Sequence, residues 1–229
     1  MESRCENCII RQFNSLRALS KEELKKVSNA KISKKIKKGD ALFSEGQKLD
    51  GVYCVRNGVS KLSKLSSNGK EQIVKLTNRG EIMGQRSVIA EDYTNLGATA
   101  INDMEVCFIP KEIITTTLNT NPYFSLEVLR HMAHDLKEAD DVIVNMSQKT
   151  VKQRLAEALL YLRQNYGEDE NGFLLLTLSR DDYANIVGAA TESLIRMLSD
   201  FKKKGLIKTE GKKIGIVNDC ALKELIDGF

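Results

Sequence analysis

The cysteines are the first residues whose type and spacing could do chemistry. Cys5 and Cys8 are separated by two residues, as thiolate ligands of metals often are, and Cys54, Cys107 and Cys220 are spread along the rest of the chain. Five thiols are an odd number, and the N-terminus shows no export pattern, so a disulfide framework is not expected. Reduced thiols or a metal centre fit these cysteines better.

An acidic and a basic residue near the C-terminus form a second candidate site. Glu192 and Arg196 are four residues apart, so on a helix they share a face and can brace one another. Arginine offers a bidentate fork to guanine O6 and N7, glutamate accepts from the cytosine amino group, and Ile195 could contact a thymine methyl group. The alternative is a surface salt bridge worth about a few tenths of a kcal/mol. The residues around the pair favour the contact with DNA bases.

Those residues predict a winged helix-turn-helix. Ser179 can cap a first helix, Gly188-Ala189-Ala190 predicts a tight turn, and Thr191 is expected to cap a second helix that ends at Gly205. A helix over 150–166 and a short strand over 173–178 come before this motif, and a hairpin over 206–217 forms the wing. The residues expected to contact the DNA backbone are Ser179, Thr191, Ser193, Lys212 and Lys213.

The composition is that of a globular protein of the cytoplasm. The chain has 229 residues, enough for two domains, with 41% hydrophobic and 29% charged residues. No stretch approaches the roughly 20 apolar residues that cross a bilayer, so no membrane partner is expected. Residues 151–229 hold 12 basic and 12 acidic side chains, but residues 191–213 hold seven basic against three acidic ones. Positive charge is therefore concentrated on the second helix and the wing.

Residues 30–110 predict short strands. Apolar and β-branched runs at 51–55 and 72–76 are separated by turn signals at 38–40, 45–46, 57–58, 68–69 and 79–80. Asn57-Gly58 and Asn68-Gly69 are hairpin signals, because both central positions of such turns tolerate positive φ. Turns that recur about every 10 residues indicate an antiparallel sandwich or barrel.

A helical period replaces the strand pattern after Pro122. Apolar residues at 3-4-3-4-3 spacing form a continuous seam about three heptads long: Leu129, Met132, Leu136, Ala139, Ile143 and Met146. The seam could pack on its own domain, but its length and the charges beside it favour a parallel coiled coil with a second copy.

The sequence resembles the Crp/Fnr family of transcription regulators along nearly its whole length. The resemblance is carried by residues 178–182 (LSRDD), 188–196 (GAATESLIR) and 204–207 (KGLI), and by the order of the domains. It implies that Glu192 and Arg196 contact bases and that Ile195 modulates them. It also implies a homodimer that binds a palindromic operator in double-stranded DNA and contacts RNA polymerase.

The resemblance also identifies a degenerate effector pocket. The ligand-binding Gly-Glu pair of the cyclic-nucleotide branch aligns with Gly84-Gln85, so the ribose-binding carboxylate has become an amide. The Arg-Ser pair aligns with Thr94-Asn95, so the phosphate-binding arginine is gone, although Arg86 could supply a cation nearby. The ligand-binding polar residues of the long helix align with Ala139 and Asp140, and Asp140 would repel an anionic ligand.

The oxygen-sensing branch of the family uses a four-cysteine iron–sulfur cluster. Cys5 and Cys8 resemble the start of its N-terminal array, and Cys107 matches its distant ligand. The third N-terminal position falls near Asn14, so the chain is one thiolate short of the four that a [4Fe–4S] cluster normally has. Free or redox-active thiols are the alternative for Cys5, Cys8 and Cys107.

Two other groups of residues have ordinary explanations. His131 and His134 lie three apart on the long helix and could share a metal, but a solvent-facing pair is the expectation. The lysine run from Lys31 to Lys38 is expected to be the solvated face of the first strand.

The predicted fold is α+β: an N-terminal arm (1–20), a jelly-roll-like antiparallel β-roll sensor domain (21–121), a dimerisation helix (122–149) and a winged helix-turn-helix domain (150–229). The alternative function is a ligand- or redox-sensing module that acts through protein contacts, which the neutral charge of residues 151–229 favours. We find no nucleophile–base constellation, P-loop or metal-ligand helix in the sequence, so an enzyme is not expected.

The degenerate pocket predicts that the protein does not bind cyclic AMP tightly, because neither a ribose-binding carboxylate nor the phosphate-binding arginine is in place. Isothermal titration calorimetry should detect no binding of cyclic AMP at micromolar concentration. A micromolar dissociation constant would overturn this prediction.

Overall fold

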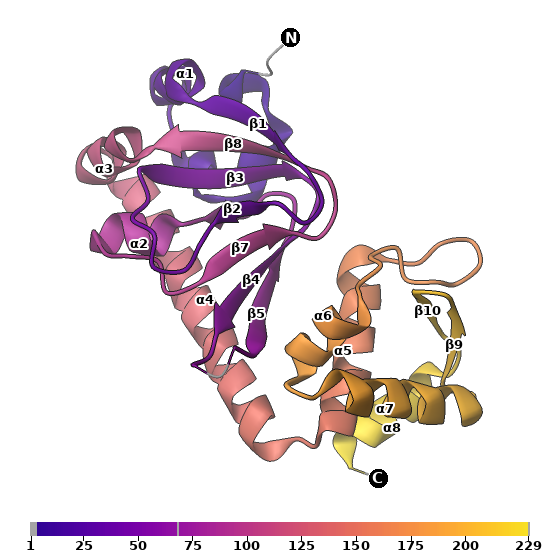
Figure 1. Ribbon diagram of the computed structural model, residues 1–229. Helices are drawn as coiled ribbons and strands as arrows, with labels where there is room; N and C mark the ends of the chain where they lie inside the picture. Colours follow the sequence, from indigo (N-terminus) through magenta and orange to yellow (C-terminus); the bar gives the residue numbers. More distant parts are fainter. Residues whose placement is uncertain (1–3, 68, 229) are drawn as a thin grey trace. The chain divides into compact units, whose positions relative to one another are not determined.

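The chain folds into two units, shown in the computed structural model of Figure 1, which describes residues 4–67 and 69–228. The first unit comprises residues 1–64 and 74–139, and the second comprises residues 65–73 and 140–229. Asn68 of the predicted Asn68-Gly69 turn lies outside the described residues. The predicted α+β fold is confirmed, with β-sheets in the first unit and a helix-turn-helix in the second.

Two four-stranded sheets form the first unit. In one sheet the strand order is β1–β8–β3–β6, and these antiparallel strands are Ile32–Ile36, Met104–Pro110, Gly51–Asn57 and Ile82–Met83. In the other the order is β2–β7–β4–β5, with strands at Ala41–Phe43, Gly97–Ala100, Ser60–Leu65 and Glu71–Thr77, of which Leu65 and residues 71–73 belong to the second unit. The predicted run of short strands between turns therefore forms a two-layered β-roll.

The pairing of β3 with β8 forms the centre of this unit. Val52 and Val55, which point to opposite faces of β3, and Val106 of β8 are fully buried, so this strand pair is covered on both faces. A Cβ atom on Gly51 would collide with the carbonyl oxygen of Ile109, so the close approach of the two strands requires glycine at this position.

Asn57-Gly58 does not make the predicted hairpin. Gly58 has a positive φ of 89°, but β3 and β4 on either side of it belong to different sheets. The turn carries the chain from one sheet to the other, and β3 pairs instead with β8 and β6. Turn chemistry was therefore predicted correctly here, but strand pairing was not.

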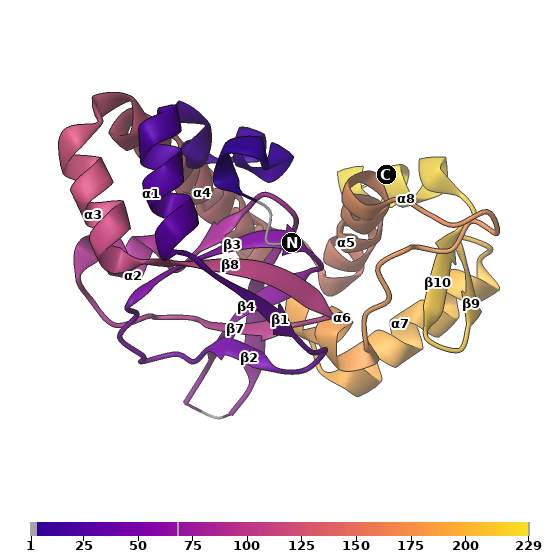
Figure 2. The same ribbon diagram turned by 90° about the horizontal axis from the view of Figure 1, so that it is seen from above.

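Helices cover the ends and one side of the β-roll. The N-terminal arm forms three 3-10 segments, η1 (Cys5–Asn7), η2 (Ile9–Phe13) and η3 (Ser15–Ala18), before α1 (Lys21–Ala30). Figure 2 shows α1 beside α3 (Lys111–Thr120), and α2 (Gln85–Ala90) follows β6. The long helix α4 (Pro122–Gln148) begins at a proline and buries Phe124 and Val128 against the core.

The second unit is built around α5 (Val151–Tyr166). It also contains α6 (Arg180–Val187), α7 (Thr191–Lys203), the β9–β10 hairpin (Ile207–Glu210 and Lys213–Ile216) and α8 (Asp219–Asp227). Thr150 caps α5 in a capping box with Gln153, where the predicted helix begins.

The strand predicted over 173–178 does not form. Leu174, Leu176 and Leu178 are buried at alternate positions, so the period-2 pattern is real. However, in the part of the chain that the structure describes, the run forms one isolated bridge, between Leu174 and Glu168, with backbone hydrogen bonds at Phe173, Leu174 and Leu175 rather than a continuous ladder. The segment is extended because its leucines fill the core, not because a ladder holds it.

The buried face of α7 predicts how strongly this helix is anchored. Phe201 is fully buried, so its replacement by alanine should lower the free energy of unfolding by about 3–5 kcal/mol. Ile195 lies half-exposed on the same helix, and Ile195→Ala should change the stability by less than about 0.5 kcal/mol. Urea unfolding followed by circular dichroism measures both variants, and equal losses would contradict this account of the packing.

Candidate nucleic-acid interface and sensor sites

The helix-turn-helix is fixed by its caps and by one glycine. Ser179 is the N-cap of α6 and forms a capping box with Asp182, as predicted for this helix start. Gly188 ends α6 with a φ of +65°, the left-handed conformation that glycine adopts at the least cost. The N–H of Ala189 donates to Ala184 O, and the chain turns directly into α7.

The residues predicted to contact bases lie together on the exposed face of α7. Glu192 and Arg196 are exposed, and Ile195 is 50% exposed, whereas Leu194 and Leu198 on the other face are buried. The predicted bracing of Glu192 by Arg196 is wrong in this structure. Arg196 Nη2 instead approaches Ser193 Oγ at 3.4 Å, and we find no ion pair between Glu192 and Arg196 in the described chain. Neither charged end is therefore neutralised by the other, and both are exposed to a further partner.

Two of the predicted backbone-contacting hydroxyls are already engaged. Thr191 does not cap α7: the N-cap is Ala190, and Thr191 Oγ1 donates to Asp181 Oδ1 at 2.7 Å. Ser179 Oγ donates to Asp182 Oδ2 at 2.6 Å within its capping box. These two residues hold α6 and the start of α7 in position, because their hydroxyl protons are used inside the motif.

The wing presents lysines at its tip. Lys212 and Lys213 are exposed at the β9–β10 turn, and Lys213 Nζ lies 3.5 Å from Asp169 Oδ2. Sequence reasoning missed Arg180 on α6, whose guanidinium donates to Gly211 O at 3.0 Å and to Lys212 O at 3.4 Å. Arg180 thus ties the wing tip to the first helix of the motif. Its position directly after the capping Ser179 is the feature of the sequence that could have indicated a role at the start of α6.

The long helix carries an uncovered apolar seam. The exposed fractions of Leu129, Leu136 and Ile143, which are seven residues apart, are 62%, 64% and 65%. Ala139 is also exposed, whereas Met132 and Met146 are half-buried, and Met132 packs on the core of the β-roll. The predicted seam is therefore divided. The row of Leu129, Leu136 and Ile143 is exposed, whereas Met132 of the other row packs within the chain.

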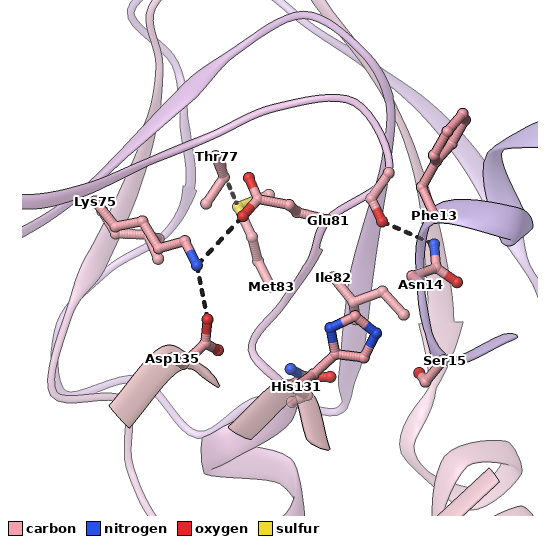
Figure 3. A pocket seen from close by; sticks show the side chains of 13 residues that line it. Phe13, Asn14, Ser15, Lys75, Thr77, Glu81, Ile82, Met83, His131 and Asp135 are labelled. Carbon is pink, nitrogen blue, oxygen red and sulfur yellow. Dashed lines mark hydrogen bonds and ion pairs between the residues drawn. The ribbon is translucent and has the colours of Figure 1, made fainter. Parts of the chain in front are cut away.

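A cavity of about 80 Å³ opens between the β-roll and α4 of the first unit (Figure 3). Of the predicted effector-pocket residues, Gln85 lines this cavity. Thr94 is buried and donates to Ser44 O, Arg86 donates to Asn95 Oδ1 at 2.8 Å, and Gly84 is the N-cap of α2. The structure thus pairs Arg86 with Asn95 rather than bringing the predicted set together around one space.

Charges around Lys75 determine what the cavity can hold. Lys75 Nζ lies 2.7 Å from Asp135 Oδ1, 3.1 Å from Glu138 Oε2 and 3.3 Å from Glu81 Oε1. Burial opposes the charge on Lys75, but the hydrogen bond that Lys75 donates to Asp135 and the charge of Glu81 raise its pKa. Burial raises the pKa of Glu81 against the opposing effect of Lys75. Three carboxylates around one ammonium group make this cavity unfavourable for an anionic ligand.

The two histidines are not a solvent-facing pair. His131 is half-buried and lines the cavity, as Figure 3 shows, whereas His134 is exposed and its Nε2 lies 3.3 Å from Glu138 Oε1. Residues three apart on a helix differ by about 60° around its axis, so His131 can line the cavity while His134 remains in solvent. Within residues 4–67 and 69–228, no three His, Cys, Asp or Glu side chains are placed to hold a single metal ion.

Four of the five thiols line a second, smaller cavity. Cys5, Cys8 and Cys107, the predicted candidates, meet there with Cys54, which sequence reasoning did not include. The sequence places Cys54 in a predicted strand. Which residues lie next to it depends on how that strand pairs, and the positions of the cysteines along the chain do not indicate the pairing. Cys220 is exposed on α8, and all five cysteines are free thiols.

The lysine run is not wholly a solvated face. Lys34, Lys35, Lys37 and Lys38 are exposed as predicted, but Lys31 is only 8% exposed. Lys31 follows α1, and its ammonium group lies 3.8 Å from Cys107 Sγ. Its position between the helix and β1 turns the side chain inward, toward the thiol cavity.

Comparison with known proteins gives the same two parts in the same order. A family described as the cyclic nucleotide-binding domain matches residues 33–121, and a family described as the Crp-like helix-turn-helix domain matches residues 153–225. The fumarate and nitrate reduction regulatory protein of Vibrio cholerae is 30% identical over 96% of this chain and 89% of its own length. The anaerobic regulatory protein of Aggregatibacter actinomycetemcomitans is also 30% identical, over 96% of this chain and 87% of its own.

Solved structures share the fold. A Crp/Fnr-family protein from Eubacterium rectale superposes with a TM-score of 0.79 at 21% identity, covering 93% of this chain and 97% of that one. The regulator TTHA1359 from Thermus thermophilus gives 0.73 at 24% identity, covering 86% and 99%. No helix among the described residues is long and apolar enough to cross a membrane. The helix-turn-helix, the β-roll and the curated relatives together establish that this chain belongs to the Crp/Fnr family of DNA-binding transcription regulators.

Proposed function

We propose that the protein is a homodimer that reads a palindromic operator with the exposed face of α7. The observation that carries this proposal is the separation of the two faces of α7. Leu194, Leu198 and Phe201 anchor one face, while Glu192, Ile195 and Arg196 on the other have no competing ion pair among the described residues. Side chains near the start of a recognition helix reach the base edges of the major groove. Arg196 would bind guanine, Glu192 would accept from cytosine, and Ile195 would tune the choice.

Backbone contacts would come from the wing and the start of α7. Lys212 and Lys213 at the wing tip would neutralise phosphates, and Ser193 would contact the backbone beside the base-reading residues. Ser179 and Thr191 would act chiefly by positioning α6 and α7, because their hydroxyls are engaged within the motif. Arg180 would keep the wing at a fixed distance from α6.

Dimerisation would use the exposed row of α4. Leu129, Leu136 and Ile143 recur at heptad spacing and each is more than half exposed, which an isolated chain would leave against water. Parallel packing of two such helices gives the two-fold symmetry that a palindromic operator requires. The dimer would act in the cytoplasm and contact RNA polymerase, and its effector would not be cyclic AMP.

The relatives do not favour a module that acts only through protein contacts, since they are transcription regulators with the same helix-turn-helix. The balanced charge of residues 151–229 is compatible with DNA binding because the lysines of α7 and the wing lie close in sequence. Specific binding would thus depend on where the charge is placed rather than on its total.

Replacing Arg196 tests the base contact. Arg196→Ala should weaken binding to the strongest DNA site by about 1–3 kcal/mol and relax the preference at one base position in each half-site. Lys212→Ala should weaken binding to all sequences about equally and reduce the salt slope by about 1. Fluorescence anisotropy over a salt series measures both effects, with Lys223→Ala on α8 as the matched control. Unchanged binding and selectivity in Arg196→Ala would exclude the proposed base contact.

Replacing Leu136 tests the dimer seam. Leu136→Glu places a carboxylate in the open row and should convert the dimer to a monomer in analytical ultracentrifugation, because a paired copy would bury like charges against each other. Lys137→Glu changes the next exposed residue of α4 and should leave the dimer intact. If wild type sediments as a monomer, or if Leu136→Glu remains dimeric, α4 does not form the interface.

A further inference from the structure

We propose that Cys54 is the fourth thiolate ligand of an iron–sulfur cluster that Cys5, Cys8 and Cys107 also bind. The N-terminal array is one cysteine short, and the structure places a thiol from β3 at the same cavity as the other three. This inference goes beyond the proposed function, because it concerns the β-roll alone and does not depend on DNA binding.

Strand pairing brings Cys54 to its partner. In the antiparallel register of β3 and β8, Cys54 is directly opposite Cys107. Directly opposed residues point to the same face of a sheet with their Cβ atoms about 4.5–5.5 Å apart. Both side chains are buried. The two strands therefore present two thiols side by side, and η1 and η2 of the arm place Cys5 and Cys8 over them.

The thiols are close enough to influence one another. Burial, followed by the nearby thiols of Cys107, Cys8 and Cys5, raises the pKa of Cys54 to about 12. Iron can still displace its proton, because a coordinating thiol is deprotonated outright.

Asn14 links the missing ligand position to Cys54. The third N-terminal cysteine position of the family falls near Asn14, which is buried. Its Nδ2 donates to Gly80 O at 2.8 Å and lies 3.6 Å from Cys54 Sγ. An amide side chain thus lies near the position expected for the third thiol, and the thiol of Cys54 lies beside its nitrogen.

Cations around the cavity suit a negatively charged group. A cluster held by four thiolates carries a net negative charge, and Lys31, Arg11 and Arg56 line the same cavity. Lys31 is buried with its Nζ 3.8 Å from Cys107 Sγ. Arg56 Nε is buried and has no hydrogen-bond partner among the described residues. A bound cluster would offer sulfur acceptors to this donor.

The spacing of the thiols favours a cluster over one ion. No three of them converge on a single-ion site within the described chain, and the ligands of a cluster stand farther apart because bridging sulfides separate its irons. The cavity measures about 20 Å³, room for about one water molecule, so η1 and η2 must move outward when the cluster enters.

Loading is tested by ligand exchange under anaerobic conditions. A preformed [4Fe–4S] cluster that carries four small thiolates is added to the full-length protein. Each cysteine thiol replaces one small thiolate, its proton leaves with that thiolate as a free thiol, and the irons keep their oxidation states. Wild type should bind about four irons and about four sulfides per chain. Protein that binds no cluster, or that is isolated with zinc in place of iron and sulfide, would overturn the proposal.

Cys54→Ser provides the decisive comparison, because serine keeps the shape but is not a thiolate. It should reduce retention of the cluster against an iron chelator by at least about 10-fold, as Cys107→Ser should, whereas Cys220→Ser should behave as wild type. Circular dichroism checks that each variant is folded. If Cys54→Ser fails to fold, iron X-ray absorption of the loaded wild type decides. A first shell of sulfur alone supports Cys54 as a ligand, and an oxygen or nitrogen ligand contradicts it, as does full retention in Cys54→Ser.

Discussion

The antiparallel pairing of β3 with β8 is the interaction on which the first unit depends. It buries Val52, Val55 and Val106 completely and joins strands that lie about 50 residues apart in the sequence. Gly51 permits the close approach of the strands because any Cβ there would meet the carbonyl of Ile109. The same register places Cys54 opposite Cys107, so the core of the β-roll and the thiol cavity are set by one pairing.

A different constraint governs the second unit, where two faces of one helix have separate tasks. The buried face of α7 packs on the unit's core and fixes the orientation of the helix, while the exposed face carries side chains that contribute little to stability. The hydroxyls of Ser179 and Thr191 and the guanidinium of Arg180 make contacts within the motif. Such contacts pre-organise a binding surface, so less conformational freedom is lost when a partner binds.

Much of this structure was predicted from helix caps, turn residues and apolar periodicity, because each of these features depends on only a few neighbouring residues. The capping box at Ser179, the left-handed Gly188 and the apolar period of α7 are each determined within one or two turns of chain. The predictions were wrong at positions whose structure depends on contacts with residues distant in the sequence. Asn57-Gly58 makes a turn as its residues demand, but the next strand joins another sheet. The leucines at 174–178 alternate in burial without a ladder, because this run forms one isolated bridge with the neighbouring backbone.

The residues of the candidate sites show the same difference between local and long-range contacts. Glu192, Ile195 and Arg196 lie on one short helix, so their common face followed from spacing alone. Cys54, Lys31 and Arg180 act across strands or helices, and only the folded chain shows what they contact. The effector-pocket residues were placed by alignment, and the structure shows Arg86 held by Asn95 rather than facing the cavity that Gln85 lines.

The most direct test of the central claim is the selection of bound sequences from a random pool of double-stranded DNA. If two copies of α7 read successive major grooves, the enriched sequences should be two-fold symmetric, with half-sites about one helical turn apart. Enrichment of a single unrepeated motif, or no enrichment above the input pool, would contradict the account.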